Sequence, residues 1–303
     1  MGKPDWDSRD YAKPRCSAVS NTVTRPAPAK VNLFLRVLAR EENGYHGIET
    51  LYCLIDLADR LQATAVDAPG VTIMVSGADT GPDQDNLALR AAEMVLAATG
   101  RPFGVSLTLD KRIPVRAGLG GGSSDAAAAL VAVNELAGHA VPRHELLQFA
   151  ARLGSDVPFL VSQARLALGW GHGERLLRLP PLPSRPGLLL VPELGIDTTE
   201  AYGLIDSVQQ AARRGSVVMG TETLQNWSDV ARLSGNDFEA PIFGRHEGIR
   251  LAFEALVGSN PLMCRMSGSG SALLALYRST RDRDDAQEMV PGSLGRIIPF
   301  ATA

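Results

Sequence analysis

A run of small residues near the middle of the chain has the composition of a phosphate-binding loop. It consists of Gly118, Leu119, Gly120, Gly121, Gly122, Ser123 and Ser124. An alanine-rich stretch follows, so we expect a helix from about Ser124 to Ala137 whose N-terminus presents free backbone N–H groups to an anion. A glycine-rich turn is the alternative. Each glycine costs backbone entropy on folding, and four in five positions are more than a turn needs.

Two better-known phosphate loops are excluded by spacing. A Walker loop has a lysine directly after its last glycine, and the dinucleotide fingerprint needs a third glycine where Ser123 stands. Ser124 is a candidate ligand for magnesium or for a phosphate, while capping of the helix by the same side chain is an equal alternative. A second small-residue segment holds Gly268 and Gly270 ahead of an apolar strand. The two loops together suggest that both bind the same polyphosphate.

A lysine and an aspartate are candidates for the charges that phosphoryl transfer needs. Lys30 stands near the start of an apolar strand, and Asn32, two residues later, projects to the same face. Asp156 follows a helix and precedes an apolar run. Phosphoryl transfer requires a carboxylate near the acceptor hydroxyl and a cation near the transferred charge. A surface lysine and a turn aspartate are the alternatives for each segment taken alone, and spacing does not bring Lys30 and Asp156 together.

The composition argues against several classes of protein. The chain has 30 basic and 33 acidic residues, a net charge of −3, and its basic residues are scattered. Neither nucleic acid nor a membrane surface is therefore an expected partner. No apolar run reaches the roughly 18 residues of a membrane helix. The three cysteines fit neither a zinc site nor a disulfide framework, so we expect unpaired thiols and a cytoplasmic location.

The candidate residues lie among mixed strands and helices. Alternating apolar residues predict strands over 29–37, 48–61, 71–77 and 105–109, and helical spacing predicts helices over 86–99 and 143–153. The proline-rich segment 179–187 predicts a connection, and 187–192 predicts the first strand of a second domain. A chain of 303 residues is long enough for two domains. We expect an α+β fold with mainly antiparallel strands in the first domain.

Three segments, in this order, resemble the motifs of the GHMP kinases. They are 26–35 (PAPAKVNLFL), 114–130 (PVRAGLGGGSSDAAAAL) and 266–276 (MSGSGSALLAL). Segments 43–61, 198–202 and 236–239 are similar to the branch of this superfamily that acts on a cytidine diphosphate derivative. The resemblance covers about Arg25 to Tyr277. It implies a ribosomal S5-like N-terminal domain over 23–180, which binds ATP, and a ferredoxin-like domain on the substrate side over 181–303. The polar composition of residues 1–22, and not the resemblance, predicts a flexible N-terminal extension.

The resemblance also implies an activity and its residues. ATP, with magnesium, would phosphorylate a hydroxyl of a small cytidine diphosphate substrate, with Asp156 as general base and Lys30 polarising that hydroxyl. The loop 118–124 would hold the phosphates, and Asn86 and Lys111 would flank the adenine. The substrate-binding residues would be Asn32, Tyr45, His46, Tyr202, Gly268 and Gly270.

Within that substrate set, the family pattern implies that three side chains bind the cytosine ring. Tyr45 would stack on the ring, Tyr202 would close its other face, and His46 would bond its edge. From the residues alone, the favoured interpretation of Tyr45 and His46 is an amphipathic turn pair.

Two positions depart from the family pattern. Ser162-Gln163 stands where a glycine pair is usual, and His172 stands where arginine is usual. We expect these departures to alter local loop shape and not to touch the chemistry. Monomer and homodimer both remain open.

Overall fold

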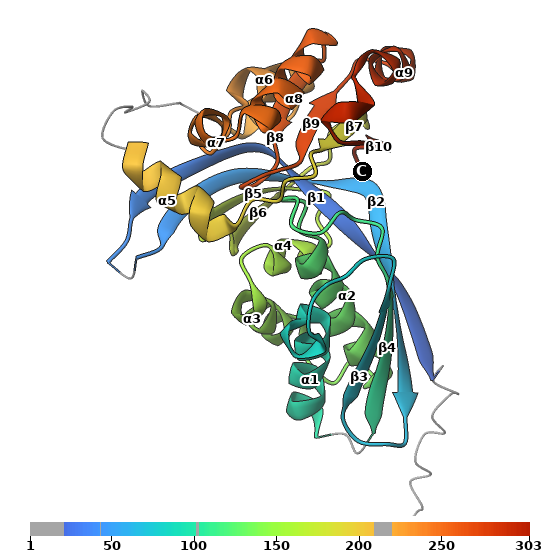
Figure 1. The fold of residues 1–303 in the computed structure, drawn as a ribbon. Helices are drawn as coiled ribbons and strands as arrows, with labels where there is room; N and C mark the ends of the chain where they lie inside the picture. Colours follow the sequence, from blue (N-terminus) through green and yellow to red (C-terminus); the bar gives the residue numbers. More distant parts are fainter. Residues whose placement is uncertain (1–20, 43, 101–102, 209–219) are drawn as a thin grey trace, which may run out of the picture.

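The computed structural model describes residues 21–42, 44–100, 103–208 and 220–303, and these form two sheets with helices on them (Figure 1). Residues 1–20 of the expected N-terminal extension lie outside the described residues. Its last residue, Thr22, belongs to the fold, because it begins the first strand and pairs with Thr64. Among the described residues, no helix has the length and apolar character needed to cross a bilayer.

Two long strands form the backbone of the molecule. β1 (Thr22–Arg40) and β2 (His46–Val66) pair antiparallel along almost their whole length, and their register shifts at three points. The first sheet has the order β3-β4-β2-β5-β6, with β1 also paired to β2. Its other strands are β3 (Val71–Ser76), β4 (Gly104–Asp110), β5 (Leu166–Gly171) and β6 (Arg175–Leu179). Only β3 and β4 run parallel, so the predicted antiparallel character of the first domain is confirmed.

Four helices pack together on the first sheet, as Figure 1 shows for its lower half. They are α1 (Leu87–Thr99), α2 (Gly121–Leu136), α3 (Arg143–Leu153) and α4 (Val157–Ser162), with a 3₁₀ turn at Asp83–Asp85. α1 ends where the sequence predicts, because Asn86 caps its first turn and Gly100 adopts the left-handed conformation that stops it. α2 begins three residues earlier than predicted, since Gly121 and Gly122 take helical angles behind the left-handed Gly120. Its alanines are almost all buried.

The second sheet has the order β10-β7-β9-β8 and is antiparallel throughout. Its strands are β7 (Pro186–Val191), β8 (Met263–Met266), β9 (Leu273–Leu276) and β10 (Arg296–Ala301). The helices of this half are α5 (Thr198–Val208), α6 (Trp227–Leu233), α7 (Glu239–Arg245), α8 (Glu247–Gly258) and α9 (Thr280–Met289), with 3₁₀ turns at Thr221–Leu224 and Gly292–Leu294. The proline-rich connection is confirmed, because β6 ends at Leu179 and β7 begins at Pro186.

Backbone hydrogen bonds join the first sheet to the second half of the molecule at several places. Leu35 in β1 donates to the carbonyl of Gly235 and accepts from the N–H of Asp237. The last residue, Ala303, donates to the carbonyl of Leu54 in β2. α5 lies across the far ends of β1 and β2 (Figure 1). The long strands therefore carry side chains that both halves of the molecule can reach.

Candidate active site

A cavity of about 610 Å³ opens between the long strands, the two glycine loops, α4 and α5. Ten residues predicted from the sequence line it: Lys30, Asn32, Tyr45, His46, Gly118, Gly120, Ser123, Asp156, Tyr202 and Gly268. These residues come from segments as far apart in the chain as β1 and the second glycine loop. The fold thus brings the lysine, the aspartate and both loops together.

Lys30 lines this cavity with its side chain almost fully buried, and acceptors surround its ammonium group. The Nζ atom donates to Asn32 Oδ1 at 2.7 Å and to the carbonyl of Gly118 at 3.0 Å, and it lies 3.3 Å from Asp156 Oδ2. The bond to Asn32 confirms that both side chains share one face of β1. The strand pairing shifts register on either side of them, and such bulges re-aim side chains toward a site. Lys30 is therefore a fixed charge and not a snorkelling surface lysine.

A relay of hydrogen bonds behind Lys30 fixes its direction. Asn32 donates through Nδ2 to Thr50 Oγ1 at 2.7 Å, and Thr50 donates in turn to a backbone carbonyl of β1 at 2.7 Å. Because Nδ2 is used in this bond, the amide oxygen of Asn32 must face the lysine. Both Asn32 and Thr50 are buried, so the relay is shielded from water.

Asp156 stands at the N-terminal edge of α4, where the sequence suggested a helix-terminal aspartate. Its side chain makes no capping hydrogen bond, and it is 27% exposed toward the cavity. The carboxylate therefore has Lys30 on one side and open space on the other. This is the arrangement expected of a group that accepts a proton from a bound hydroxyl.

Tyr52 is a site residue that the sequence analysis did not single out. It lies in β2, is fully buried, and lines the cavity beside Asp156. Burial and, second, the charge of Asp156 raise the pKa of Tyr52 well above its usual value. The two groups do not reach hydrogen-bond geometry, and no atom of the described residues pairs with the phenolic hydroxyl. A neutral donor therefore stands next to the carboxylate.

The two glycine loops touch each other next to Lys30. A Cβ on Gly118 would overlap the carbonyl of Ser267, and a Cβ on Gly120 would lie 2.9 Å from Lys30 Cγ. Both glycines also have positive φ, at 75° and 69°. Ser267 Oγ donates to the carbonyl of Gly118 at 3.0 Å. Glycine is thus required at 118 and 120 by contact with the neighbouring loop and with Lys30.

The N-terminus of α2 faces the cavity through Gly120 and Ser123. The first helical N–H groups have no partner within a helix, and the 16-residue helix has no acidic residue in its first turn. Backbone donors and the helix dipole together favour an anion here. Ser124 faces elsewhere, because its hydroxyl donates to the carbonyl of Pro28 at 2.7 Å and the residue is buried.

The remaining predicted loop residues lie outside the cavity lining. Leu119 is in the hydrophobic core and contributes its carbonyl to the N–H of Lys30. Gly121 rests on Ile113 and Lys111, Gly122 is open, and Gly270 packs on Met266 and Ile196.

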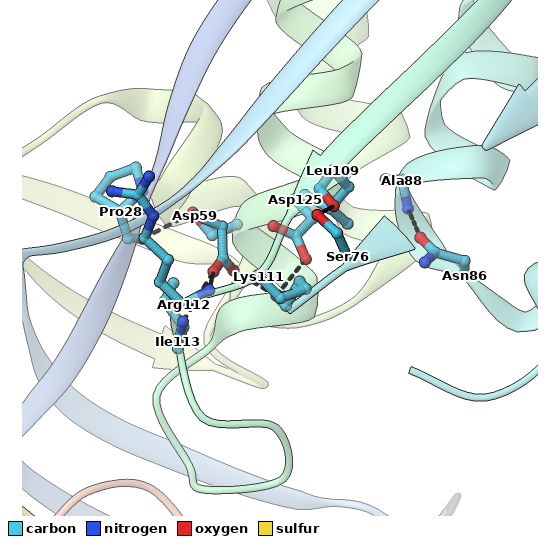
Figure 2. A network of polar contacts seen from close by, with 11 residues as sticks. Pro28, Asp59, Ser76, Asn86, Ala88, Leu109, Lys111, Arg112, Ile113 and Asp125 are labelled. Carbon is cyan, nitrogen blue, oxygen red and sulfur yellow. Dashed lines mark hydrogen bonds and ion pairs between the residues drawn. The ribbon is translucent and has the colours of Figure 1, made fainter. Parts of the chain in front are cut away.

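Asn86 and Lys111 lie on the far side of the glycine loop, in the polar network of Figure 2. Asn86 Oδ1 accepts from the N–H of Ala88 as the cap of α1. Lys111 is buried between Asp59 and Asp125 and donates to both carboxylates. Figure 2 shows Lys111 between the two aspartates at the end of β4, so its charge is already paired.

In that network, the carboxylate of Asp125 is the group whose hydrogen bonds are incomplete. Its Oδ1 atom is buried and has no hydrogen-bond partner among the described residues. Loss of solvent raises its pKa to about 7, an effect that Lys111 opposes and Asp59 reinforces. Asp59 has more hydrogen-bond donors around it, since it also accepts from the backbone N–H groups of Arg112 and Ile113.

Aromatic rings gather at the other end of the cavity. Tyr202 of α5 stacks on His46, with ring centroids 5.2 Å apart and an interplanar angle of 18°. Tyr45 is 66% exposed, and its ring lies 5.3 Å from that of His172. His172 also lines the cavity. His172, which departs from the family pattern, thus lies beside Tyr45 at the end of the cavity away from Lys30 and Asp156, because the turn after β5 folds back against Tyr45.

The described residues contain no cluster of three or more His, Cys, Asp or Glu side chains that would hold a metal ion. Within the cavity, the one carboxylate next to the glycine loops is Asp156, and it is already paired with Lys30. These residues suit a magnesium ion that arrives on a nucleotide, whose phosphates supply most of its ligands.

Comparison with known proteins agrees with this arrangement. Residues 86–163, which include the glycine loop and Asp156, match the family model of the GHMP kinases N terminal domain. A homoserine kinase from Cytophaga hutchinsonii has the same fold, with a TM-score of 0.70 over 95% of this chain and 96% of that one, at 17% identity. The fold is that of the GHMP kinases, which confirms the predicted α+β two-domain class.

Closer relatives narrow the family. A 4-diphosphocytidyl-2-C-methyl-D-erythritol kinase from Solibacter usitatus is 40% identical over 263 residues, covering 83% of this chain and 80% of the relative. A crystal structure of 4-(cytidine 5′-diphospho)-2C-methyl-D-erythritol kinase has a TM-score of 0.75 and 34% identity, covering 93% of this chain and 99% of that one. The chain belongs to the 4-diphosphocytidyl-2-C-methyl-D-erythritol kinase family.

Proposed function

We propose that this protein transfers the γ-phosphoryl group of ATP to the 2-hydroxyl of 4-diphosphocytidyl-2-C-methyl-D-erythritol, a step of the non-mevalonate isoprenoid pathway. One observation carries the proposal. The Lys30–Asp156 pair, 3.3 Å apart, lies against two glycine loops at one end of a cavity whose other end is aromatic. Phosphates fit the first end and a nucleobase fits the second.

In this proposal Asp156 accepts the proton of the acceptor hydroxyl. An aspartate is a weak base for an alcohol, so its contribution comes from position, and the proton leaves late in a loose transition state. Lys30 keeps the carboxylate aimed at the cavity, and its positive charge stabilises the oxygen that attacks. Its bonds to Asn32 and Gly118 hold that charge in place before substrate arrives.

The triphosphate would lie against the N-terminus of α2, with backbone N–H groups near Gly120 and Ser123 as donors. Magnesium, bound through the phosphates, neutralises part of their charge. Gly268 closes the site from the second loop, since a Cβ there would come within 3.5 Å of Lys30 Nζ. Asn86 and Lys111 would support the adenine side through the backbone that they hold in place, because their own polar groups are engaged with protein.

The cytidine would lie at the aromatic end. Tyr45 is exposed enough to stack on a base, and His46 lines the cavity next to it. Tyr202 supports the ring of His46 and brings its own face to the same end. The buried free thiols of Cys53 and Cys264 suit the reducing cytoplasm that we propose as its location.

The test is ATP consumption by the purified protein against a panel of alcohols, each with magnesium. The panel comprises the cytidyl-methylerythritol substrate, homoserine, mevalonate, phosphomevalonate and galactose. Turnover confined to the cytidyl compound is expected. Turnover of a different alcohol would keep the phosphoryl-transfer site but refute the cytidine assignment, and ATP binding without any turnover would refute the kinase assignment.

A further inference from the structure

A carboxylate outside the predicted site residues holds the imidazole of His46. Nε2 of His46 lies 2.8 Å from Asp206 Oδ1, and the side chain of His46 is only 3% exposed. His46 begins β2, whereas Asp206 lies in α5, 160 residues later in the chain. Both residues line the cavity.

The same helix fixes the ring in a second way. Tyr202, one turn before Asp206 in α5, stacks on the face of the imidazole. The second oxygen of Asp206 lies 3.6 Å from Arg40, so the carboxylate has a partner at each of its oxygens. The imidazole is thus held at one nitrogen and on one face. Its other nitrogen, Nδ1, has no hydrogen-bond partner within the described part of the chain and is the one left for a ligand.

The chemistry of the pair decides what that ligand must offer. An ionised carboxylate only accepts hydrogen bonds, so Nε2 must carry the proton of the neutral imidazole. Nδ1 is then a bare acceptor. A ligand group that meets Nδ1 must donate a hydrogen bond, as an exocyclic amino group does and a carbonyl oxygen does not.

We propose that Asp206 is a positioning residue that fixes the tautomer of His46 and thereby makes this cavity select an aminopyrimidine over an oxopyrimidine. The inference rests on the proposed function in placing a pyrimidine at this end of the cavity. Cytosine carries an amino group where uracil carries a carbonyl oxygen. A bare Nδ1 accepts a hydrogen bond from the amino group and repels the carbonyl oxygen. The tautomer of His46, and not only the presence of a histidine, therefore selects the base.

The decisive experiment compares the affinities of cytidine 5′-diphosphate and uridine 5′-diphosphate by calorimetry at about pH 8, where imidazole is ordinarily neutral. A saturating non-hydrolysable ATP analogue keeps both ligands out of the ATP site. We expect the wild-type protein to prefer the cytidine compound by at least about tenfold, the order of one hydrogen bond. In Asp206→Asn the amide can donate to Nε2, so Nδ1 can carry the proton, and the preference should fall close to parity.

A matched control lies on the same helix. Glu200 bonds Nε2 of His246 at 3.1 Å in the same manner but does not line the cavity. Glu200→Gln should therefore leave the preference unchanged. A purely structural role of Asp206 would weaken both ligands equally, and an unchanged preference in Asp206→Asn would overturn the inference.

A second measurement reads the tautomer directly. Nitrogen-15 spectra of the imidazole rings, with the His46 signals assigned from His46→Gln, should show a protonated Nε2 and a bare Nδ1 in the wild type. The reverse assignment would overturn the inference even if Asp206→Asn failed to fold. Turnover measured in parallel keeps the two claims apart, since cytidine preference without turnover would refute the proposed function alone.

Discussion

At the scale of single residues, the ammonium group of Lys30 is held by three acceptors. It has three protons, and Asn32, the carbonyl of Gly118 and Asp156 lie around them at 2.7, 3.0 and 3.3 Å. The longest of these contacts is the one to Asp156, so the carboxylate can turn toward a substrate without leaving the lysine unsatisfied. Lys30 thus orients the carboxylate of Asp156.

Asp156→Asn should therefore remove the base and little else. We expect kcat to fall by roughly 10²- to 10⁴-fold, the usual contribution of general base catalysis, while the affinity for ATP changes little. The measurement is steady-state turnover together with calorimetric ATP binding. Asp285→Asn, an exposed carboxylate in α9, is the control and should behave as wild type. A variant of Asp156 that keeps full turnover would refute its role.

Tyr52 allows a sharper separation of stability from function. Its hydroxyl is buried without a partner among the described residues, and an unpaired buried hydroxyl costs free energy. Tyr52→Phe should therefore leave the melting temperature unchanged or raise it. If the hydroxyl meets the bound acceptor, the same change should raise KM for the acceptor by roughly tenfold, the order of one hydrogen bond. Unchanged acceptor kinetics would show that this hydroxyl meets no substrate atom.

At the scale of elements, local signals predicted what local interactions build. Asn86 and Gly100 mark the ends of α1 because capping acts within one turn. The glycine loop was visible for the same reason. Asp206 and Tyr52 could not be predicted as site residues in this way. The residues beside them, His46 and Asp156, lie more than 100 residues away along the chain, and sequence spacing does not predict such contacts. The start of α2 was placed late because glycine's low helix propensity hid its first turn.

Asp59, Lys111 and Asp125 join three elements beneath the glycine loop, β2, the end of β4 and α2. Two buried carboxylates share one lysine, so the group carries an excess negative charge when both are ionised. Burial of the Asp125 carboxylate is the main cause that raises its pKa to about 7, and the nearby charge of Asp59 adds to that effect. α2 thus rests on a group whose charge depends on pH.

The sign of the resulting pH dependence follows from proton binding. Folded Asp125 keeps its proton up to about pH 7, whereas the unfolded chain releases it near the ordinary value of 3.8. Its contribution to stability is therefore full below about pH 4 and is lost as pH rises through about 7. Asp125→Asn should remove this loss, so its stability relative to wild type should grow across that window.

Urea unfolding at a series of pH values measures this difference. Asp110→Asn, an exposed carboxylate at the end of β4, is the control and should show no comparable trend. A constant difference between Asp125→Asn and wild type from pH 4 to 8 would contradict the shifted titration of Asp125.

At the scale of the whole molecule, one buried amide links the two halves at the site. Asn236 pairs with β1 at Leu35, and its Nδ2 donates at 2.7 Å to the carbonyls of both Met266 and Gly268. Its Oδ1 accepts from the N–H of Phe238 at 3.0 Å. The side chain of Asn236 therefore ties the second glycine loop, which touches the first at Gly118, to the segment that pairs with β1 at Leu35.

Asn236→Ala should loosen that joint. Asn236 is only 1% exposed, so the three backbone groups that bond its side chain would lose their partner in a buried place. Each buried unpaired group costs about 1–3 kcal/mol. We expect a lower urea midpoint and, in the protein that stays folded, a lower kcat because Gly268 no longer closes on Lys30. Asn226→Ala is the matched control, since that asparagine only caps the exposed start of α6 and its loss costs about 1 kcal/mol without an effect on catalysis. Equal losses of stability and activity in the two variants would show that the halves are held together elsewhere, through the pairing of β1 with β2 and the bond from Ala303 to Leu54.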